Sequence, residues 1–464
     1  MSMKTLCIWI IVAGVLGAGV LMIRARQASA MLSGPIITSR TIGFDPSETA
    51  GVEVIGDGAH QVLERDPDRP DRWLIRWVES GLDHSWVASP SKARSGLRAL
   101  ATARVMLSEV DLVETTGGEV NIRKRDGDVI RVVFDAGTSG GYQAVRIEER
   151  DRDGVASGRW FGRVEASLFE TFVGKGMLGW RSDRLFEITN SAVRLVELEA
   201  MGASVVLGQT NTGWVIEQPI QIHGQRTTIE DLVKVLLSLE SKSFVDDEID
   251  SQTTGIANPI AKVKIATTDQ TAVLTIGTRA DINGETVYAQ VESATGSALI
   301  TLATDQLSKL TAAVEAYISK TPSPASSGAI ASVRINGRDG IERFIASRTM
   351  GNWIIDDTQA DSINRDAIDR LVGVLARDEA LFVRFFDADA VPTAMGYVEL
   401  LSADGSVLDG FGIALDSTQA GMRVLIFREL GNGQVVLWAS DSEAAMATGA
   451  WLTAVAGKRV RASE

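Results

Sequence analysis

The pattern of apolar and polar residues between positions 213 and 239 predicts a strand that contains Trp214, then a polar turn, then a helix. After the turn, four apolar residues follow the i, i+3, i+4, i+7 spacing that places side chains on one face of a helix. Because such a stripe is stabilised mainly by packing, we expect this helix to lie against a sheet. The stripe consists of Ile229, Leu232, Val233 and Leu236.

Thr227 is the predicted N-cap of this helix, because Glu230 follows it three residues later. In this capping-box spacing, each side chain bonds a backbone N–H that the first helical turn leaves unpaired. On either side of the helix, the runs 193–197, 262–265 and 272–276 alternate in part between apolar and polar residues, which is typical of half-buried strands.

The same pattern recurs at intervals of about 140 residues. The run 352–355 matches 213–216 around a tryptophan, and Ile368, Leu371 and Val372 match the apolar stripe. A weaker copy lies earlier in the chain, with Trp73 to Val78 as a predicted strand and Ser89-Pro90 at the start of the matching helix. A repeat of this length indicates duplicated domains and not solenoid turns.

We therefore predict an α+β protein with an N-terminal transmembrane helix followed by three repeated units, each an antiparallel sheet with a packed amphipathic helix. A length of 464 residues fits about three domains. The linker is assigned from its Pro, Ser and Gly content, which should bury little and stay extended. The predicted segments are the anchor and its flank at 1–30, the divergent first unit at 40–180, the second unit at 181–318, the linker at 319–328 and the third unit at 329–464.

Residues 6–23 form an uncharged run near the lower length limit for a helix that crosses a bilayer. The alternative is a cleaved signal peptide, because Ala28-Ser29-Ala30 has the small-x-small pattern of a cleavage site. We favour the anchor, since Arg24 and Arg26 separate the apolar run from that site.

The expected location is the cytoplasmic membrane, with a single span and an extracytoplasmic body. The only cysteine, Cys7, lies inside the apolar run, so the body contains none, which is compatible with an oxidising envelope compartment. The formal net charge of −14 argues against nucleic acid as a partner, because phosphate binding requires clustered Lys and Arg.

The sequence offers few groups for chemistry, and we predict no catalytic, cofactor-binding or metal-binding residue. The histidines His60, His84 and His223 stand alone, without a second ligand at zinc-site spacing. Residues 137–141 match G-x-S-x-G around Ser139, but a strand-like segment follows where a nucleophile elbow needs a helix. A glycine-rich hairpin is therefore the favoured interpretation of this motif.

Two acidic clusters and the tryptophans also allow a functional interpretation. The clusters are Asp246 to Asp250 and the set Asp66, Asp68 and Asp71; both lack the EF-hand spacing and are interpreted as solvated loops. Ten tryptophans could stack on sugars, but Trp214 and Trp353 recur at one place in two units, with Trp73 as their counterpart. We favour core packing for all three.

These features resemble the family of domain of unknown function 4340. The residues that carry the resemblance are the lead-in Phe44-Asp-Pro-Ser, the strand Val52-Glu-Val54, the strand Gly213-Trp214-Val-Ile216 and the strand end Ile276-Gly277. The resemblance implies one membrane helix at the N-terminus, repeated units, and genes near ABC-type exporters and gliding-motility auxiliary proteins. It carries over no catalytic residues.

The resulting expectation is a non-enzymatic membrane-anchored envelope protein, an accessory or binding subunit of an ABC-type export system. Its expected partners are an ABC-type permease or other envelope proteins, with the membrane contacted through residues 6–23. The alternative is an envelope protein that binds a ligand or polysaccharide. A hydrolase, with Ser139 as its best candidate nucleophile, is the third interpretation.

Overall fold

The computed structural model describes residues 38–456, apart from 57–59, 68, 80–81, 248, 309, 311–312, 356–357, 360–361, 388–392, 419–420 and 431–432. The predicted membrane helix at 6–23 lies outside the described residues. Within the described part of the chain, none of the helices combines the length and the apolar character that crossing a membrane requires.

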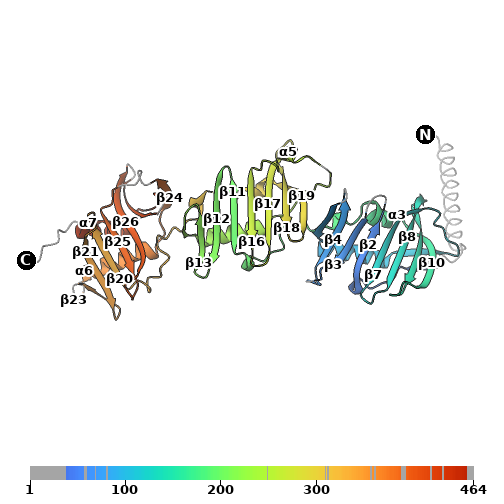
Figure 1. The fold of residues 1–464 in the computed structure, drawn as a ribbon, viewed down its shortest axis with the longest axis horizontal. Coiled ribbons are helices and arrows are strands. Elements are labelled where there is room, and N and C mark those ends of the chain that lie inside the picture. The colour runs from blue at the N-terminus through green and yellow to red at the C-terminus, as the bar shows by residue number, and fades with distance from the viewer. Residues whose placement is uncertain are drawn as a thin grey trace, which may run out of the picture. The chain divides into compact units, whose positions relative to one another are not determined.

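The chain forms three antiparallel sheets with few helices, which confirms the predicted antiparallel sheets (Figure 1). It divides into two compact units. One contains residues up to Asp183 together with Thr295–Ser297, and the other contains the remaining residues. The first sheet lies in the first unit, and the second and third sheets lie almost entirely in the second.

The first sheet has ten strands in the order β1-β6-β10-β9-β8-β7-β2-β3-β4-β5. Its elements are β1 Ser39–Thr41, η1 Pro46–Glu48, β2 Thr49–Ile55, β3 His60–Arg65, β4 Trp73–Glu79, β5 Leu82–Val87, α2 Pro90–Thr102, β6 Arg104–Ser108, β7 Thr116–Lys124, β8 Val129–Ser139, β9 Tyr142–Arg150, β10 Ala156–Glu165, α3 Ala166–Phe169, η2 Glu170–Gly174 and η3 Leu178–Trp180.

The second sheet has nine strands in the order β14-β13-β12-β11-β16-β17-β18-β19-β15. Its elements are η4 Asn190–Ala192, β11 Leu195–Ala200, β12 Ala203–Thr210, β13 Gly213–Gln218, β14 Ile222–His223, α4 Arg226–Leu237, β15 Ser243–Phe244, α5 Ser251–Thr254, β16 Ala261–Ala266, β17 Thr271–Arg279, β18 Thr286–Ser293, β19 Gly296–Ala303, η5 Thr304–Leu307 and η6 Val314–Ala316.

The third sheet has nine strands in the order β23-β22-β21-β20-β25-β26-β27-β28-β24. Its elements are β20 Ser332–Gly337, β21 Glu342–Thr349, β22 Asn352–Ile355, β23 Thr358–Gln359, α6 Ser362–Ala376, β24 Phe382–Asp387, β25 Gly396–Leu401, β26 Val407–Thr418, β27 Gly421–Glu429, β28 Gln434–Ser440 and α7 Glu443–Ala456.

One strand order underlies all three sheets. Each has four consecutive strands, then a helix, then a short strand, then four more consecutive strands. The first strands of the two four-strand runs pair with each other, as β2–β7, β11–β16 and β20–β25. The short strand pairs with the last strand, as β6–β10, β15–β19 and β24–β28. The first sheet differs only in the added edge strand β1.

The apolar stripe of α4 is buried as predicted, but the helix starts earlier than we predicted. Ile229, Leu232, Val233 and Leu236 are all at most 4% exposed. The N-cap is Gln225 and not Thr227, because the carbonyl of Gln225 already accepts the Ile229 N–H. The capping box does not form, since Glu230 binds Arg226 at 2.7 Å.

The matching helix in the first sheet, α2, begins at Pro90 with Ser89 as N-cap, which confirms the predicted start. The third sheet carries two helices, α6 and α7, where we predicted one. In α7, Trp451 packs edge-on against Phe344 of β21. Residues 443–456 are apolar on nearly every face, so they lack the amphipathic period by which the other helices were found.

Residues 319–328 bury two of their ten side chains and contact helix α6 at one point. Pro322 and Ser323 are buried, and the Ser323 N–H donates to the carbonyl of Leu375 near the end of α6 at 2.7 Å. The other eight residues of the segment are half-buried or exposed, so the segment contacts α6 mainly through Ser323, at a helix end that has free carbonyl groups. The domain boundaries that we placed around it stay predictions.

Candidate functional site

In each sheet, a pair of polar side chains connects the two central strands. The pair occupies the equivalent position in the strand pairing of all three sheets. In the first sheet, Asn121 of β7 donates to Glu53 of β2 at 3.1 Å. The pairs at the same position of the other two sheets are Lys264–Glu197 at 2.7 Å and Arg334–Glu399 at 2.9 Å. Since their sequence neighbours are buried apolar residues, these pairs mark the polar face of each sheet.

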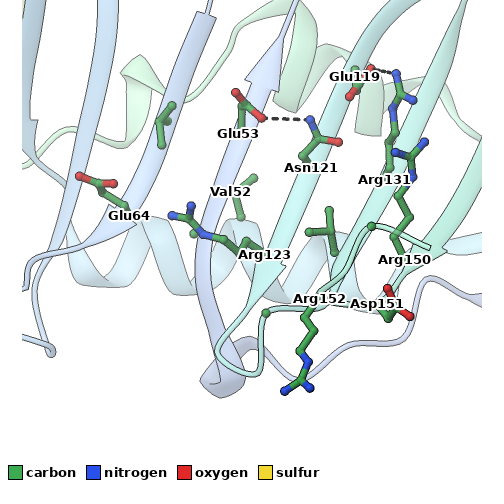
Figure 2. A pocket seen from close by; sticks show the side chains of 15 residues that line it. Val52, Glu53, Glu64, Glu119, Asn121, Arg123, Arg131, Arg150, Asp151 and Arg152 are labelled. Atoms are coloured by element: carbon green, nitrogen blue, oxygen red, sulfur yellow. Dashed lines mark hydrogen bonds and ion pairs between the residues drawn. The ribbon is translucent and has the colours of Figure 1, made fainter. Parts of the chain in front are cut away.

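A pocket of about 540 Å³ lies on the polar face of the first sheet, over β2, β3, β7 and β8 (Figure 2). Figure 2 shows Glu119 joined to Arg131 and Asn121 joined to Glu53. The charged lining is balanced, with four carboxylates and four guanidinium groups: Glu53, Glu64, Glu119, Asp151, Arg123, Arg131, Arg150 and Arg152.

Glu53 is held ionised in this pocket. Burial raises the pKa of Glu53, but hydrogen bonds from His60 and Asn121, at 2.7 and 3.1 Å, outweigh burial and lower that pKa. A carboxyl group that stays ionised can accept hydrogen bonds but is poorly suited to donate a proton at neutral pH.

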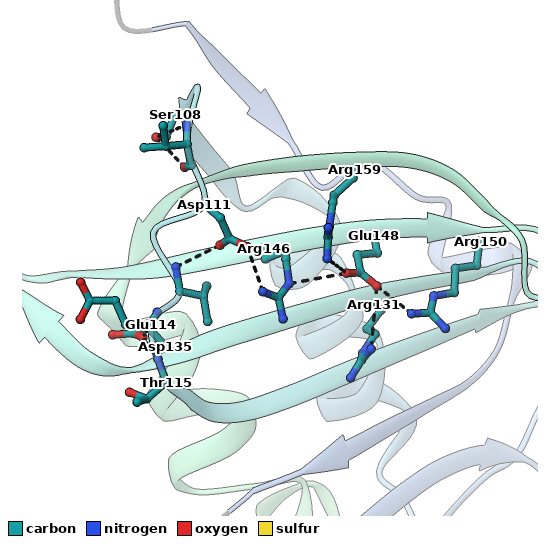
Figure 3. A network of polar contacts seen from close by, with 12 residues as sticks. Ser108, Asp111, Glu114, Thr115, Arg131, Asp135, Arg146, Glu148, Arg150 and Arg159 are labelled. Carbon is teal, nitrogen blue, oxygen red and sulfur yellow. Dashed lines mark hydrogen bonds and ion pairs between the residues drawn. The ribbon is translucent and has the colours of Figure 1, made fainter.

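Beside the pocket, four arginines surround the carboxylate of Glu148 (Figure 3). Its oxygens lie 2.8 Å from Arg150, 2.7 Å from Arg159, 3.5 Å from Arg146 and 3.8 Å from Arg131. These residues come from β8, β9 and β10, so the network fixes the register of three strands. Hydrogen bonding from Arg150 is the main cause that lowers the pKa of Glu148; burial opposes it, and Arg159 adds to the lowering.

The network is nearly balanced in charge. Arg146 also binds Asp111 at 2.9 Å, and Arg131 binds Glu119 at 2.5 Å. The side chain of Glu148 is 9% exposed, while that of Arg159 is 54% exposed. The arrangement therefore offers a fixed rim of hydrogen-bond donors to polar groups that approach the sheet.

Sequence reasoning did not identify the pocket or the Glu148 network. The signal for the network is the alternation Arg146-x-Glu148-x-Arg150, which places three charged side chains on one face of a strand. The contributions of Arg131 and Arg159 follow only from the pairing of β8 and β10 with β9.

The three recurring tryptophans belong to the core, as predicted. Trp73, Trp214 and Trp353 are 6%, 5% and 1% exposed. Because the protein itself covers nearly all of the surface of these rings, they are not placed to stack on a sugar ring.

Ser139 lies in a hairpin, as the favoured interpretation predicted. It ends β8 and pairs with Tyr142 at the start of β9, while Gly140 and Gly141 turn the chain with positive φ angles of 60° and 83°. A strand, and not a helix, follows Ser139, so the motif lacks the geometry of a nucleophile elbow.

The three histidines lie in separate surroundings. His60 binds Glu53, His84 stacks on Trp77 with ring centres 5.3 Å apart, and burial is the main cause that lowers the pKa of His223. Asp66 binds Arg72 at 2.5 Å, whereas Asp68 and Glu248 fall outside the described residues. Across the part of the chain that the structure describes, no group of three or more His, Cys, Asp or Glu is placed to hold a metal.

Residues 214–394 match the family described as "Domain of unknown function (DUF4340)". The match starts at the tryptophan of β13 and continues through the second sheet into the third, and it confirms the resemblance over that segment. The search of the curated proteins found no match.

Proposed function

We propose that this chain is a non-enzymatic envelope protein, anchored in the membrane by residues 6–23, that serves as an accessory or binding subunit of an ABC-type export system. We propose further that its three sheets are copies of one unit. The recurrence of one strand order, with a polar pair at the same ladder position each time, supports this proposal most strongly. When one fold is repeated along a chain and its surface side chains differ between the copies, each copy can provide a separate binding surface.

The polar face of the first sheet is the surface that we assign to a partner protein. Arg150 and Arg159 expose 39% and 54% of their side chains at its rim, while Glu148 holds them in place. Arginine is enriched at protein interfaces, and fixed side chains lose little conformational entropy on binding.

Crosslinking in membranes tests this assignment. A photo-crosslinking residue at position 159 should capture a permease or ATPase, while the same residue at Lys262, on a strand of the second sheet, serves as the control. Recovery of the uncrosslinked chain alone from both positions, after efficient photolysis, would argue against an export partner. Digestion of spheroplasts by protease tests the location separately, since an extracytoplasmic body is cleaved without lysis.

The second candidate is an envelope protein that binds a ligand or polysaccharide. The pocket of about 540 Å³ with its balanced charges favours it, because it offers both donors and acceptors at fixed positions. A hydrolase remains the third proposal, and an unchanged phenotype of Ser139→Ala would remove its best nucleophile.

A further inference from the structure

Each sheet has a corner in which a tryptophan pairs with a residue on the preceding strand, close to the helix. Trp73 pairs with Arg65 in the first sheet, and Trp353 pairs with Arg348 in the third. In both corners the guanidinium group lies over the indole ring, 4.4 and 4.6 Å from its centre. In the second sheet, Trp214 pairs with the uncharged Gln209.

A carboxylate closes the corner of the third sheet. Asp369 of α6 accepts hydrogen bonds from Trp353 Nε1 at 2.9 Å and from Arg348 at 3.3 Å. The single carboxylate of Asp369 therefore compensates the positive charge of Arg348 and also accepts the indole N–H of Trp353.

The first sheet carries the opposite charge at that helix position. The buried residues Ala93, Leu97 and Leu100 of α2 have the same spacing as Ile368, Val372 and Leu375 of α6. Asp369 follows Ile368 in α6, and the corresponding residue in α2 is Arg94, which follows Ala93. Four residues later, Gly373 of α6 corresponds to Arg98 of α2.

The corner of the first sheet therefore gathers cations. Arg65 donates to the backbone carbonyls of Thr49, Pro70 and Ser47, at 3.0, 2.7 and 3.4 Å, and among the residues that the structure describes it donates to no carboxylate. Burial, followed by the nearby charge of Arg125, lowers the pKa of Arg65, and the nearby carboxylate of Glu48 opposes this shift without reversing it.

Arg94 and Arg98 increase this positive charge. They stand four residues apart on one helix face, where like charges repel. Neither forms an ion pair within the described residues.

A pocket of about 670 Å³ opens at this corner. Arg65, Arg94 and Arg98 line it together with the carboxylates Asp45 and Asp71, so its ionised groups carry a net positive charge. Asp45 is already engaged, because its side chain accepts the Ser47 N–H at 2.8 Å. The apolar part of the lining includes Phe44, Trp73, Leu97 and Ala101.

We propose that this pocket binds a small amphipathic anion, a carboxylate or phosphate with an apolar body. The acid group lies among the guanidinium groups of Arg65, Arg94 and Arg98 and takes the role that the Asp369 carboxylate has in the third sheet. The apolar body lies against Phe44, Leu97 and Ala101. This site does not depend on the proposed export partner, since it is tested with the purified chain alone.

Calorimetry on the full chain in nanodiscs of zwitterionic lipid tests the proposal, with titrations into empty nanodiscs to subtract partitioning. The ligands are hexanoate, hexyl phosphate and hexanol. We expect one or both anions to bind, and Arg94→Asp to weaken that binding at least about tenfold, because it replaces a charged donor with an internal carboxylate. Arg98→Ala, which removes a second guanidinium group and keeps a residue with high helix propensity, should weaken binding in the same direction.

Arg370→Asp is the matched control, because it makes the same change in charge at an exposed position of helix α6, outside this pocket and outside the pocket on the polar face. It should leave the affinity within about twofold of the unchanged chain. Three results would overturn the proposal: binding of neither anion, binding of hexanol as strong as that of hexanoate, or equal losses for Arg94→Asp and Arg370→Asp.

Discussion

The corners of the first and third sheets share a backbone arrangement and differ in charge. In each, an arginine lies over a buried tryptophan beside the helix, but the helix contributes Asp369 in the third sheet and Arg94 in the first. In the third corner Asp369 pairs with the guanidinium group and with the indole N–H, whereas in the first corner the guanidinium groups have no carboxylate partner among the described residues. One helix position thus decides whether the same scaffold forms an internal contact or a candidate binding site.

The ring in the closed corner should matter most for stability. Trp353→Ala removes a side chain that is 1% exposed, and we expect a loss of about 3–5 kcal/mol in the local free energy of unfolding. Hydrogen exchange of the β21 and β22 amides measures this loss locally, which suits a chain with several sheets. Met350→Ala, at a side chain that is 99% exposed, is the control. Equal protection in both variants would show that the ring is not a core residue.

The Glu148 network provides a cluster of arginines that already has its carboxylate. Glu148→Gln leaves four guanidinium groups without that charge, and we expect a loss of about 3 kcal/mol at neutral pH, seen as faster exchange in β8 to β10. Since folding lowers the pKa of Glu148 below its ordinary value of 4.5, its contribution is present above pH 4.5 and disappears as the pH falls through the folded-state pKa.

Glu149→Gln is the matched control for this network. Glu149 forms one exposed ion pair with Arg40 at 2.8 Å, so its loss should cost less than about 1 kcal/mol. If both variants lose the same stability, or if the effect of Glu148→Gln persists after the pH has fallen through the folded-state pKa of Glu148, the ionised carboxylate is not what holds the three strands together.

Opening the third corner should have a smaller effect. Asp369→Arg brings a positive charge beside Arg348 and leaves Trp353 Nε1 without its acceptor. Because the Asp369 side chain is 52% exposed, we expect the local free energy of unfolding to fall by only about 1–2 kcal/mol, as measured by hydrogen exchange in β21 and β22. Asp366→Arg on the same helix should change it by less than about 0.5 kcal/mol. If Asp369→Arg left the hydrogen exchange of β21 and β22 unchanged, the Asp369 carboxylate would not be what stabilises this corner.

Closing the first corner should have the smallest effect on stability and the opposite sign. Arg94→Asp places a carboxylate near Arg65 and removes the repulsion from Arg98, so hydrogen exchange in β3 and β4 should show a gain of about 0.5–1 kcal/mol in the local free energy of unfolding. A loss of protection would show that Arg94 is needed for the fold and does not mark a binding site.

The sequence predicted those features that a repeating apolar pattern encodes. The stripe of α4, the start of α2 and the three buried tryptophans follow from spacing within one element. Helix α7 was missed because it is apolar on most faces and has no stripe. The N-cap was misplaced because the capping signal at Thr227 competes with a backbone bond that only the preceding turn determines.

The Glu148 network and the arginine–tryptophan corners depend on which strands pair with each other. The spacing of residues along the chain does not reveal that pairing. The cluster around Glu148 joins β8, β9 and β10, and the corners join two strands and a helix. The reversal between Arg94 and Asp369 becomes visible only after the buried faces of α2 and α6 have been superposed residue by residue.

The position of a bound anion tests the comparison most directly. Diffraction from crystals of the chain soaked with 6-bromohexanoate locates the bromine by its anomalous signal and the carboxylate by its density. We predict a carboxylate within about 3.2 Å of Arg94 or Arg98 in the first corner, and none in the third, where Asp369 already occupies that position. An anion bound in the third corner, or an empty first corner beside sites elsewhere, would contradict this account.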